Sequence, residues 1–158
     1  MTSKITTCLW FDTEGEEAAE FYCSVIPNSR VNNVARYGPG GPRPEGSAMT
    51  VDFELDGKPY VALNGGPDHT FNEAISLQVS CADQDEVDHF WDTLGQGGEP
   101  GPCGWLKDRF GLSWQVVPTA LPELLGDPDP DRAQRAMKAM LSMSKIDIEE
   151  MRRAADAG

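Results

Sequence analysis

The sequence predicts an α+β fold of two βαβββ modules, whose curved mixed sheets form a cleft, followed by C-terminal helices. Three observations predict it. A strand followed by a helix with a capping signal occurs twice, over residues 5–26 and 73–94. Each time a Gly-rich loop, a strand, a turn and a returning strand follow, and the remainder is helical. Because an internal duplication explains this repeated order best, we expect modules at 1–67 and 68–120 and a helical tail at 121–158.

The first module begins with a strand over 5–11 and a helix over 16–26. Thr13 and Glu16 have the spacing of a capping box, in which each side chain covers a free backbone N–H at a helix start. The helix carries apolar residues at helical spacing on one face: Ala18, Phe21, Tyr22, Val25 and Ile26. Strands are expected at 30–37, 48–55 and 58–63, with a Gly- and Pro-rich loop at 38–46 and a hairpin turn at Asp56-Gly57.

The second module repeats this plan. A strand is expected over 73–81, a capping box at Asp83 and Glu86, and a helix over 86–94 with Val87, Phe90, Trp91 and Leu94 on one face. A Gly-rich loop at 95–101 leads to a hairpin at 103–119, in which 108–111 form the turn and Gly111 supplies a positive φ. Alternation along the last strand places Leu112, Trp114 and Val116 on one face and Ser113, Gln115 and Val117 on the other.

The tail is expected to be helical. Leu121 to Leu125 form a short turn, Asp129-Pro130 begin a helix, and Asp147 with Glu150 form a third capping box. Ile146 and Met151 have the spacing of a hydrophobic staple. An apolar stripe is expected to pack on the sheet or on a second subunit: Ala133, Ala136, Met137, Met140 and Leu141.

Composition excludes several classes of protein. The chain has 158 residues, 39% of them hydrophobic and 25% charged, which is typical of a globular domain. Its net charge of −13 argues against nucleic acid and anionic membranes as partners, because both need a basic face. No stretch of about 18 apolar residues predicts a membrane span, and the N-terminus has no secretion signal.

Cysteine usage points to the cytoplasm. Cys8, Cys23, Cys81 and Cys103 form no CxxC pair and match no zinc spacing. The first three stand among apolar residues. We therefore expect reduced, buried thiols and a cytoplasmic location.

Several motifs together resemble the vicinal oxygen chelate superfamily, which includes glyoxalase I and the extradiol dioxygenases. The closer resemblance is to its PhnB-like branch, often labelled a 3-demethylubiquinone-9 3-methyltransferase domain. The matching segments are CLWFD at 8–12, EEAAEFY at 16–22, ALNGGP at 62–67, EAIS at 73–76, EVDHFWDTL at 86–94 and CGWLKDRFGLSWQVVP at 103–118. The sequence contains no Gly-rich strand–helix turn followed by an acidic residue to hold S-adenosylmethionine, so we expect neither methyltransferase activity nor a cofactor.

The resemblance also implies where a metal would lie. Metal-dependent members hold one divalent ion with His and Glu side chains from four strands, and the motifs place these positions near Thr7, at Leu63 or Asn64, at Ala74 and at Gln115. None of these is His or a carboxylate, whereas divalent cations prefer charged oxygens or imidazoles, so no metal site is expected. Glu73 would restore a charged ligand if a bulge turned it inward. His69 and His89 are expected to be exposed.

Residues expected to line the cleft come from both modules: Trp10, Asn64, Phe71, Glu73, Ser76, Cys103, Trp105 and Gln115. Trp114 alternates with Gln115, and we favour Gln115 as the cleft residue. Glu73 is the candidate catalytic residue, because burial among aromatic rings would raise its pKa and suit it to act as a general base. The alternative is a structural carboxylate paired with a backbone N–H or with Arg109. Cys103 as a nucleophile has no neighbouring His in the sequence.

Two functions follow, and whether the protein is an enzyme stays open. The first is a homodimer that binds a small organic ligand in its clefts, as antibiotic-sequestering members of the superfamily do. The alternative is a metal-dependent enzyme of glyoxalase or dioxygenase type that uses Glu73 and Gln115. A purely structural dimerisation module is a third interpretation, but it gives no role to the uncharged face of the last strand.

Overall fold

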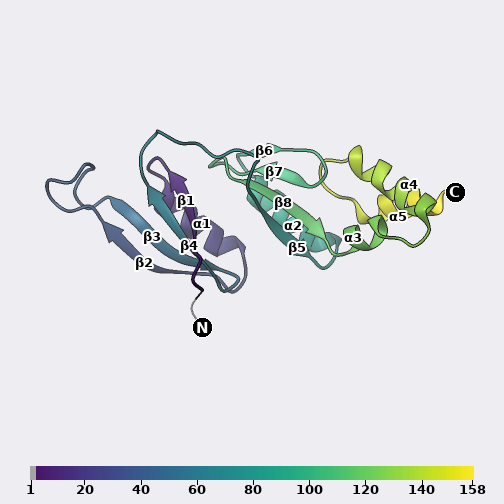
Figure 1. Ribbon diagram of the computed structural model, residues 1–158, viewed down its shortest axis with the longest axis horizontal. Coiled ribbons are helices and arrows are strands. Elements are labelled where there is room, and N and C mark those ends of the chain that lie inside the picture. Colours follow the sequence, from purple (N-terminus) through teal and green to yellow (C-terminus); the bar gives the residue numbers. More distant parts are fainter. Residues whose placement is uncertain (1–2) are drawn as a thin grey trace. The chain divides into compact units, whose positions relative to one another are not determined.

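The computed structural model describes residues 3–158, and the chain divides into two compact units. The first unit ends at Phe71 and the second runs from Asn72 to Gly158. Each unit contains one four-stranded mixed sheet, and the tail helices belong to the second unit (Figure 1). The predicted α+β class is confirmed.

The first unit has the strand order β1-β4-β3-β2. The edge strand β1 runs parallel to β4, and the other pairs are antiparallel. Asp56 and Gly57 both have positive φ, 51° and 76°, so they form the predicted hairpin turn between β3 and β4. The elements are β1 (Thr7–Phe11), α1 (Gly15–Val25), β2 (Arg30–Arg36), β3 (Ala48–Leu55) and β4 (Lys58–Asn64).

The second unit repeats this topology with the order β5-β8-β7-β6. Here β5 runs parallel to β8, as β1 does to β4, and the remaining pairs are antiparallel. The duplicated βαβββ plan is therefore confirmed. The elements are β5 (Ser76–Cys81), α2 (Gln84–Gly95), β6 (Glu99–Pro100), β7 (Trp105–Lys107), β8 (Ser113–Pro118), α3 (Ala120–Leu125), α4 (Pro130–Leu141) and α5 (Ile148–Asp156).

Three predicted boundaries are wrong. β1 begins at Thr7, and Ile5 before it is 80% exposed. β5 begins at Ser76, so Glu73 and Ala74 lie in a turn that precedes the strand. The loop predicted over 95–101 contains the short strand β6, which pairs with β7 and which its Gly and Pro content concealed.

The first helix is not capped by the predicted box. Its N-cap residue is Glu14, which makes no side-chain cap, and Thr13 precedes it. Instead, the Gly15 N–H donates to Oδ1 of Asn64, 2.7 Å away, while Nδ2 of Asn64 donates to the carbonyl of Ala48 at 3.0 Å. The end of β4 therefore supplies the cap, a long-range contact that local spacing does not reveal.

The two later capping boxes are half formed. Asp83 accepts from the Glu86 N–H at 3.0 Å and Asp147 from the Glu150 N–H at 2.9 Å, as predicted. The reciprocal contacts are absent from the residues described. Glu86 accepts instead from the Ala82 N–H, and Glu150 pairs with Arg153.

The second sheet has one apolar face, which α2 covers. Leu112, Trp114 and Val116 are at most 1% exposed, as the alternation predicted. They pack with Val87, Phe90 and Leu94 of α2, which are also buried. Trp91 of α2 and Phe21 of α1 were expected on the buried faces but stay partly exposed.

The predicted hairpin between β7 and β8 is confirmed. Gly111 has φ +88°, a conformation that suits glycine because it has no Cβ to clash. The turn also has a buried polar centre. The carboxylate of Asp108 accepts from the backbone N–H groups of Phe110 and Leu112, at 2.9 and 3.1 Å. It fixes the turn from inside, since Asp108 is only 3% exposed.

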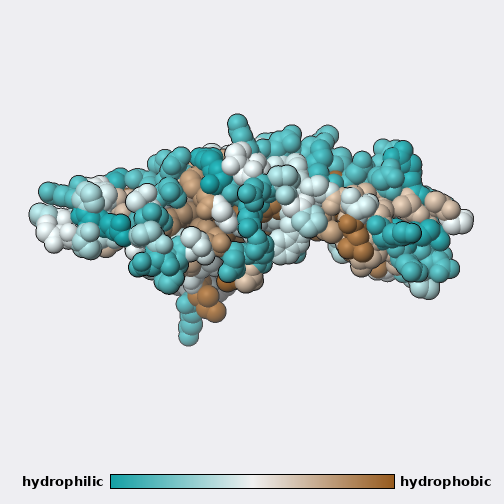
Figure 2. Space-filling model, turned by 90° about the horizontal axis from the view of Figure 1, so that it is seen from above, coloured by the Kyte–Doolittle hydropathy of each residue, from teal (hydrophilic) through white to brown (hydrophobic). Residues whose placement is uncertain are grey.

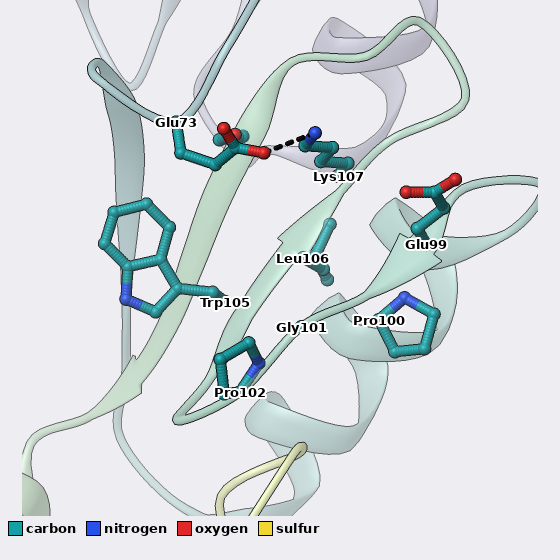
Figure 3. Close-up of a pocket in the computed structure, with 9 residues that line it drawn as sticks. Glu73, Glu99, Pro100, Gly101, Pro102, Trp105, Leu106 and Lys107 are labelled. Carbon is teal, nitrogen blue, oxygen red and sulfur yellow. Dashed lines mark ion pairs between the residues drawn. The ribbon is translucent and has the colours of Figure 1, made fainter.

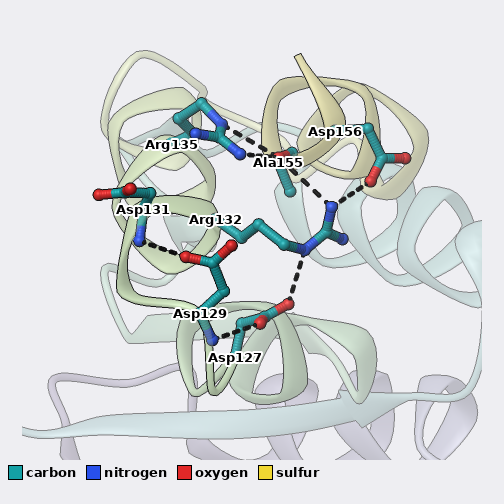
Figure 4. Close-up of polar contacts among 7 residues, drawn as sticks. All are labelled: Asp127, Asp129, Asp131, Arg132, Arg135, Ala155 and Asp156. Carbon is teal, nitrogen blue, oxygen red and sulfur yellow. Dashed lines mark hydrogen bonds and ion pairs between the residues drawn. The ribbon is translucent and has the colours of Figure 1, made fainter. Parts of the chain in front are cut away.

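The tail forms its own small core. Ile146 and Met151, the predicted staple, are both fully buried in a cluster with Leu121, Ala136 and Ala155. Arg132 joins Asp127 to Asp156 at 3.0 and 2.5 Å, and Arg135 donates to the Ala155 carbonyl (Figure 4). The predicted stripe on α4 is only partly buried: Met137 is 41% and Leu141 63% exposed.

The side chain of Gln84 is one of several groups that attach the tail to the rest of the second unit. Gln84, at the start of α2, donates to the carbonyl of Ile146 and accepts from the N–H of Ile148, both at 2.9 Å. The N-terminus of α5 is thus held against the N-terminus of α2 by a single amide that satisfies one donor and one acceptor.

The surface is hydrophilic over most of the face shown in Figure 2, as the charge of −13 implies. Within residues 3–158, no helix combines the length and apolar character needed to cross a membrane. The four cysteines are free thiols. Cys81 is buried, but Cys8 is exposed, because it lies on the face of β1 opposite the buried Leu9. The expectation of a buried Cys8 is therefore wrong.

Candidate functional site

The strand register gathers polar side chains on one face of the second sheet. Ser113 on β8 is paired with Ser76 on β5 and with Lys107 on β7. Gln115, two residues further along, is paired with Gln78 and Trp105. Residues opposite each other in register lie on the same face, here the face opposite α2. We call it the polar face; it comprises Ser76, Gln78, Glu99, Trp105, Lys107, Ser113 and Gln115.

Gln115 is held by its neighbours on this face. Its Nε2 donates to Oγ of Ser76 at 2.9 Å, and its Oε1 accepts from Nε2 of Gln78 at 3.3 Å. The predicted cleft residues Gln115 and Ser76 are thus brought into direct contact. This row presents amide and hydroxyl groups without charge to whatever lies above the sheet.

A pocket of about 380 Å³ adjoins the polar face (Figure 3). Its volume lies within the range of small-molecule sites. Most of its wall is apolar, and its polar groups come from Glu73, Glu99, Lys107 and Ser113. The lining residues are Glu73, Glu99, Pro100, Gly101, Pro102, Trp105, Leu106, Lys107 and Ser113.

Glu73 and Lys107 form an ion pair at this pocket (Figure 3). The hydrogen bond from Lys107 holds the pKa of the Glu73 carboxyl below its usual value, and the same contact raises the pKa of Lys107. The side chain of Glu73 is 61% exposed. The condition for a general base, burial among aromatic rings, is not met, because Glu73 stands in an exposed turn beside a cation; Glu73 is a paired carboxylate, as in the alternative. Its partner is Lys107, whereas the sequence had suggested Arg109 as the cation that would pair with Glu73.

Ser113 carries an unusual hydroxyl. The residue is 1% exposed, and its Oγ is buried with no hydrogen-bond partner among the residues described. A buried hydroxyl without a partner costs about 1–3 kcal/mol. Such groups are rare in folded proteins, so this one, in the wall of a pocket, calls for an explanation.

The first unit holds three of the predicted cleft residues, and they do not form one site. Trp10 donates from Nε1 to the Gly66 carbonyl at 2.9 Å and packs edge-on against His69. Phe71 packs edge-on against Phe11, with ring centroids 5.2 Å apart. Trp10 is therefore held within its own unit.

Asn64 lies on the other face of the first sheet from Trp10. It is paired in register with Phe11, the neighbour of Trp10 along β1. Successive strand residues point to opposite faces, so Asn64 faces α1, where it is 6% exposed and bonded to backbone on both sides. Its role in the structure is to cap α1.

Cys103 lies outside the pocket lining, although Pro102 and Trp105 near it belong to that lining. It has a positive φ of 59°, and its N–H donates to the Met143 carbonyl in the tail at 2.9 Å. The residue thus connects the hairpin to the tail through its backbone.

The positions that the resemblance assigns to metal ligands do not match a divalent cation. On the polar face they offer only the neutral amide of Gln115, and Ala74 lies before β5. His69 and His89 are exposed, as expected. Over residues 3–158, no three His, Cys, Asp or Glu side chains are grouped as metal ligands. This donor set does not fit the family's ion, which needs charged oxygens or imidazoles.

Several residues of the pocket were not predicted as site residues from the sequence, among them Glu99, Pro100, Pro102 and Lys107. The predicted four-residue turn at 108–111 would pair Lys107 with Leu112 and place Lys107 on the opposite face from Gln115. In the structure Leu112 also belongs to the connection, so Lys107 is paired with Ser113 and shares the face of Gln115. Glu99 required recognition of β6, which local sequence does not reveal because the strand has only two residues.

Comparison with known proteins identifies relatives of the whole double module. A family model described as 3-demethylubiquinone-9 3-methyltransferase matches residues 3–117. The PhnB protein from Bacillus cereus, whose description carries the same methyltransferase name, is 33% identical. The match covers 74% of this chain and 100% of that one, with a TM-score of 0.68. A search of the curated proteins finds no match.

More distant structures share the fold. Protein PA1353 from Pseudomonas aeruginosa is 18% identical, with a TM-score of 0.61 over 74% of this chain and 98% of its own. The fosfomycin resistance protein FosX from Listeria monocytogenes is 13% identical, with a TM-score of 0.51 over 78% and 98% of the two chains. At these identities the likeness concerns the fold alone.

Proposed function

The chain belongs to the 3-demethylubiquinone-9 3-methyltransferase family, the PhnB-like branch of the vicinal oxygen chelate superfamily, and on this premise we propose that it binds a small organic ligand in the pocket beside Trp105. The name of the family is not evidence for methyl transfer by this chain. The proposal concerns binding at the second sheet, without a metal at the family's usual position.

The unpaired hydroxyl of Ser113 is the observation that carries the proposal. A protein that served only as a scaffold would gain stability by placing an alanine or a hydrogen-bond partner there. Stability is often reduced at binding sites, because groups intended for a ligand stay unsatisfied until it binds. Ser113 belongs to the pocket lining, so a small shift of the side chains that cover its oxygen would let a ligand supply the missing partner.

The remaining wall suits an organic molecule. Trp105 on β7 and Pro102 on the adjoining segment offer apolar surface. Ligand sites combine such a surface with few polar groups that fix orientation. The lining also contains the polar side chains of Glu73 and Lys107 (Figure 3), together with Ser113.

The alternative, a metal-dependent enzyme that uses Glu73 and Gln115, has less support. The charge of Glu73 is compensated by Lys107, and both ends of the Gln115 amide have partners. A metal ion would have to displace these contacts, and Glu73 would be the one charged ligand that it obtained in return. A thermal-shift titration with Zn²⁺, Ni²⁺, Mn²⁺ and Fe²⁺ tests it directly: a shift that Glu73→Ala abolishes would favour the enzyme.

A fragment screen tests the binding proposal. Saturation-transfer NMR with a library of neutral and charged aromatic fragments is expected to yield binders to the unmodified chain. Trp105→Ala should weaken these binders at least tenfold, because the indole supplies the largest apolar surface of the pocket. Ile5→Ala, which removes an exposed apolar side chain of the first unit outside the lining, serves as the matched control. Equal binding by Trp105→Ala and the control would refute the proposal.

A further inference from the structure

The charges around the pocket select the ligand. Three charged side chains belong to its lining: Glu73, Glu99 and Lys107. One cation and two carboxylates give the lining a net charge of −1, on a chain whose own net charge is −13. An anion entering the pocket would therefore meet an unfavourable field, and a cation a favourable one.

Glu73 competes with any anionic ligand for Lys107. The ammonium group of Lys107 is already paired with Glu73, and the negative charge of Glu99 also stabilises its charged form. Because Glu73 belongs to the same chain, it stays close to Lys107 at any dilution. An external carboxylate or phosphate would have to compete with this permanent partner. Glu99, by contrast, has no ion-pair partner within 4.0 Å in the part of the chain that the structure describes, and its carboxylate is exposed.

Trp105 adds a second feature that favours a cation. The indole is partly exposed and lies on the same face as Lys107, two residues along β7. The face of a tryptophan ring attracts organic cations through its quadrupole, more strongly than phenylalanine or tyrosine does. Pro102 lies beside it and supplies an apolar contact for a flat group (Figure 3).

Glu99 is the group that can hold the charged end of such a ligand. Its carboxylate is exposed, and Glu99 is paired in register with Lys107, two residues from Trp105 along β7. From these observations we infer that the pocket takes an organic cation, a protonated amine attached to a flat apolar group, with the ammonium directed to Glu99 and the apolar part against Trp105. This inference rests on the proposed binding function and names its ligand class.

Three probes of similar size separate charge from shape: 2-phenylethylamine, 2-phenylethanol and 3-phenylpropanoate. Each is titrated into ¹⁵N-labelled protein, and the signals of the Trp105 indole N–H and of the backbone over residues 99–107 are followed. We expect the amine to bind at least threefold more tightly than the alcohol, and the carboxylate to bind more weakly than both. The preference for the amine should fall as salt is added, since exposed charges are screened.

Two variants assign the effect to the pocket. Glu99→Gln should weaken amine binding about threefold or more and leave the alcohol unchanged, as expected for the loss of one charge about 6 Å away in a water-like medium. Asp85→Asn removes the same charge from the exposed first turn of α2 and should change neither affinity. If it weakens the amine as much as Glu99→Gln does, the overall charge of the chain is responsible and the inference is wrong.

The outcomes distinguish the two proposals. The cation inference fails if the alcohol or the carboxylate shifts the Trp105 signal at the same concentration as the amine does, or at a lower one. Binding at the pocket would then still stand. If no probe shifts the Trp105 signal, the cation inference also fails, and the fragment screen with Trp105→Ala then decides the binding function by itself.

Discussion

The carboxylate of Asp108 accepts a hydrogen bond of 2.8 Å from the indole Nε1 of Trp114, and both residues are buried. The same carboxylate accepts from two backbone N–H groups of the turn. One side chain thus connects the turn, the apolar face of β8 and the core beneath α2. The hairpin that carries the pocket residues Trp105, Lys107 and Ser113 depends on this connection.

Replacing Asp108 should therefore destabilise the second unit. Asp108→Ala leaves three buried or partly buried donors without an acceptor, so we expect the free energy of unfolding to fall by about 3 kcal/mol or more. Asp108→Asn keeps one oxygen and should cost less. Urea denaturation followed by tryptophan fluorescence measures both. A loss below about 1 kcal/mol for the alanine variant would mean that water replaces the carboxylate.

Asn64 and Gln115 should respond differently to alanine. Asn64 is 6% exposed and bonds the Gly15 N–H and the Ala48 carbonyl, so Asn64→Ala should cost about 2–3 kcal/mol of unfolding free energy. Gln115 is partly exposed and bonds side chains only, so Gln115→Ala should cost less than about 2 kcal/mol. Parallel urea titrations test the order, and a reversed order would contradict these roles.

Cys81 should make stability depend on pH in the alkaline range. Burial, with the charges of Glu86 and Asp83, raises the pKa of its thiol from 9.0 to about 11. The unfolded chain then loses this proton at lower pH than the folded chain does. The free energy of unfolding is therefore fully retained below pH 9 and falls between pH 9 and about 11.

The variant Cys81→Ala isolates this contribution. Its unfolding free energy should fall less steeply over the same pH range, by up to about 2 kcal/mol in total. Ion pairs of lysine residues also weaken there, but they do so in both proteins. Identical slopes for the two proteins would show that the Cys81 thiol does not contribute.

Self-association is expected through the tail. α4 exposes Met137 and Leu141, which are 41% and 63% accessible, next to the buried cluster of the tail. We propose that the chain is a homodimer in which a second copy covers these side chains. Sedimentation at micromolar concentration should give twice the chain mass of 17.2 kDa, and Leu141→Glu should shift it toward the monomer. A single species of 17.2 kDa for the unmodified chain would refute this prediction.

Periodicity predicted the double βαβββ plan and the faces of β8 because helix and strand periods are local signals. Leu112, Trp114 and Val116 lie buried as their alternation required. The sequence could not predict the cap of α1, since Asn64 lies 49 residues from Gly15. Local sequence patterns do not indicate which residues so far apart in the chain will be in contact.

The pocket was predicted in part. Glu73 and Trp105 line it, and the contact between Gln115 and Ser76 lies on the adjoining polar face. Asn64, by contrast, is buried and caps α1 in the first unit. The state of Glu73 depended on its partner, and the partner depended on the register of β7 with β8. The unpaired state of Ser113 depends on packing from several segments, so no spacing in the sequence indicates it.

The most direct test of the account is the unfolding free energy of Ser113→Ala, measured by urea denaturation without any ligand. If the hydroxyl is kept unpaired for a ligand, its removal should leave stability unchanged or raise it by about 1 kcal/mol, because a buried polar group without a partner is lost. The same variant should bind the fragments of the screen more weakly. A loss of more than about 1 kcal/mol would show that the hydroxyl supports the fold, and the central observation for a ligand at this pocket would be withdrawn.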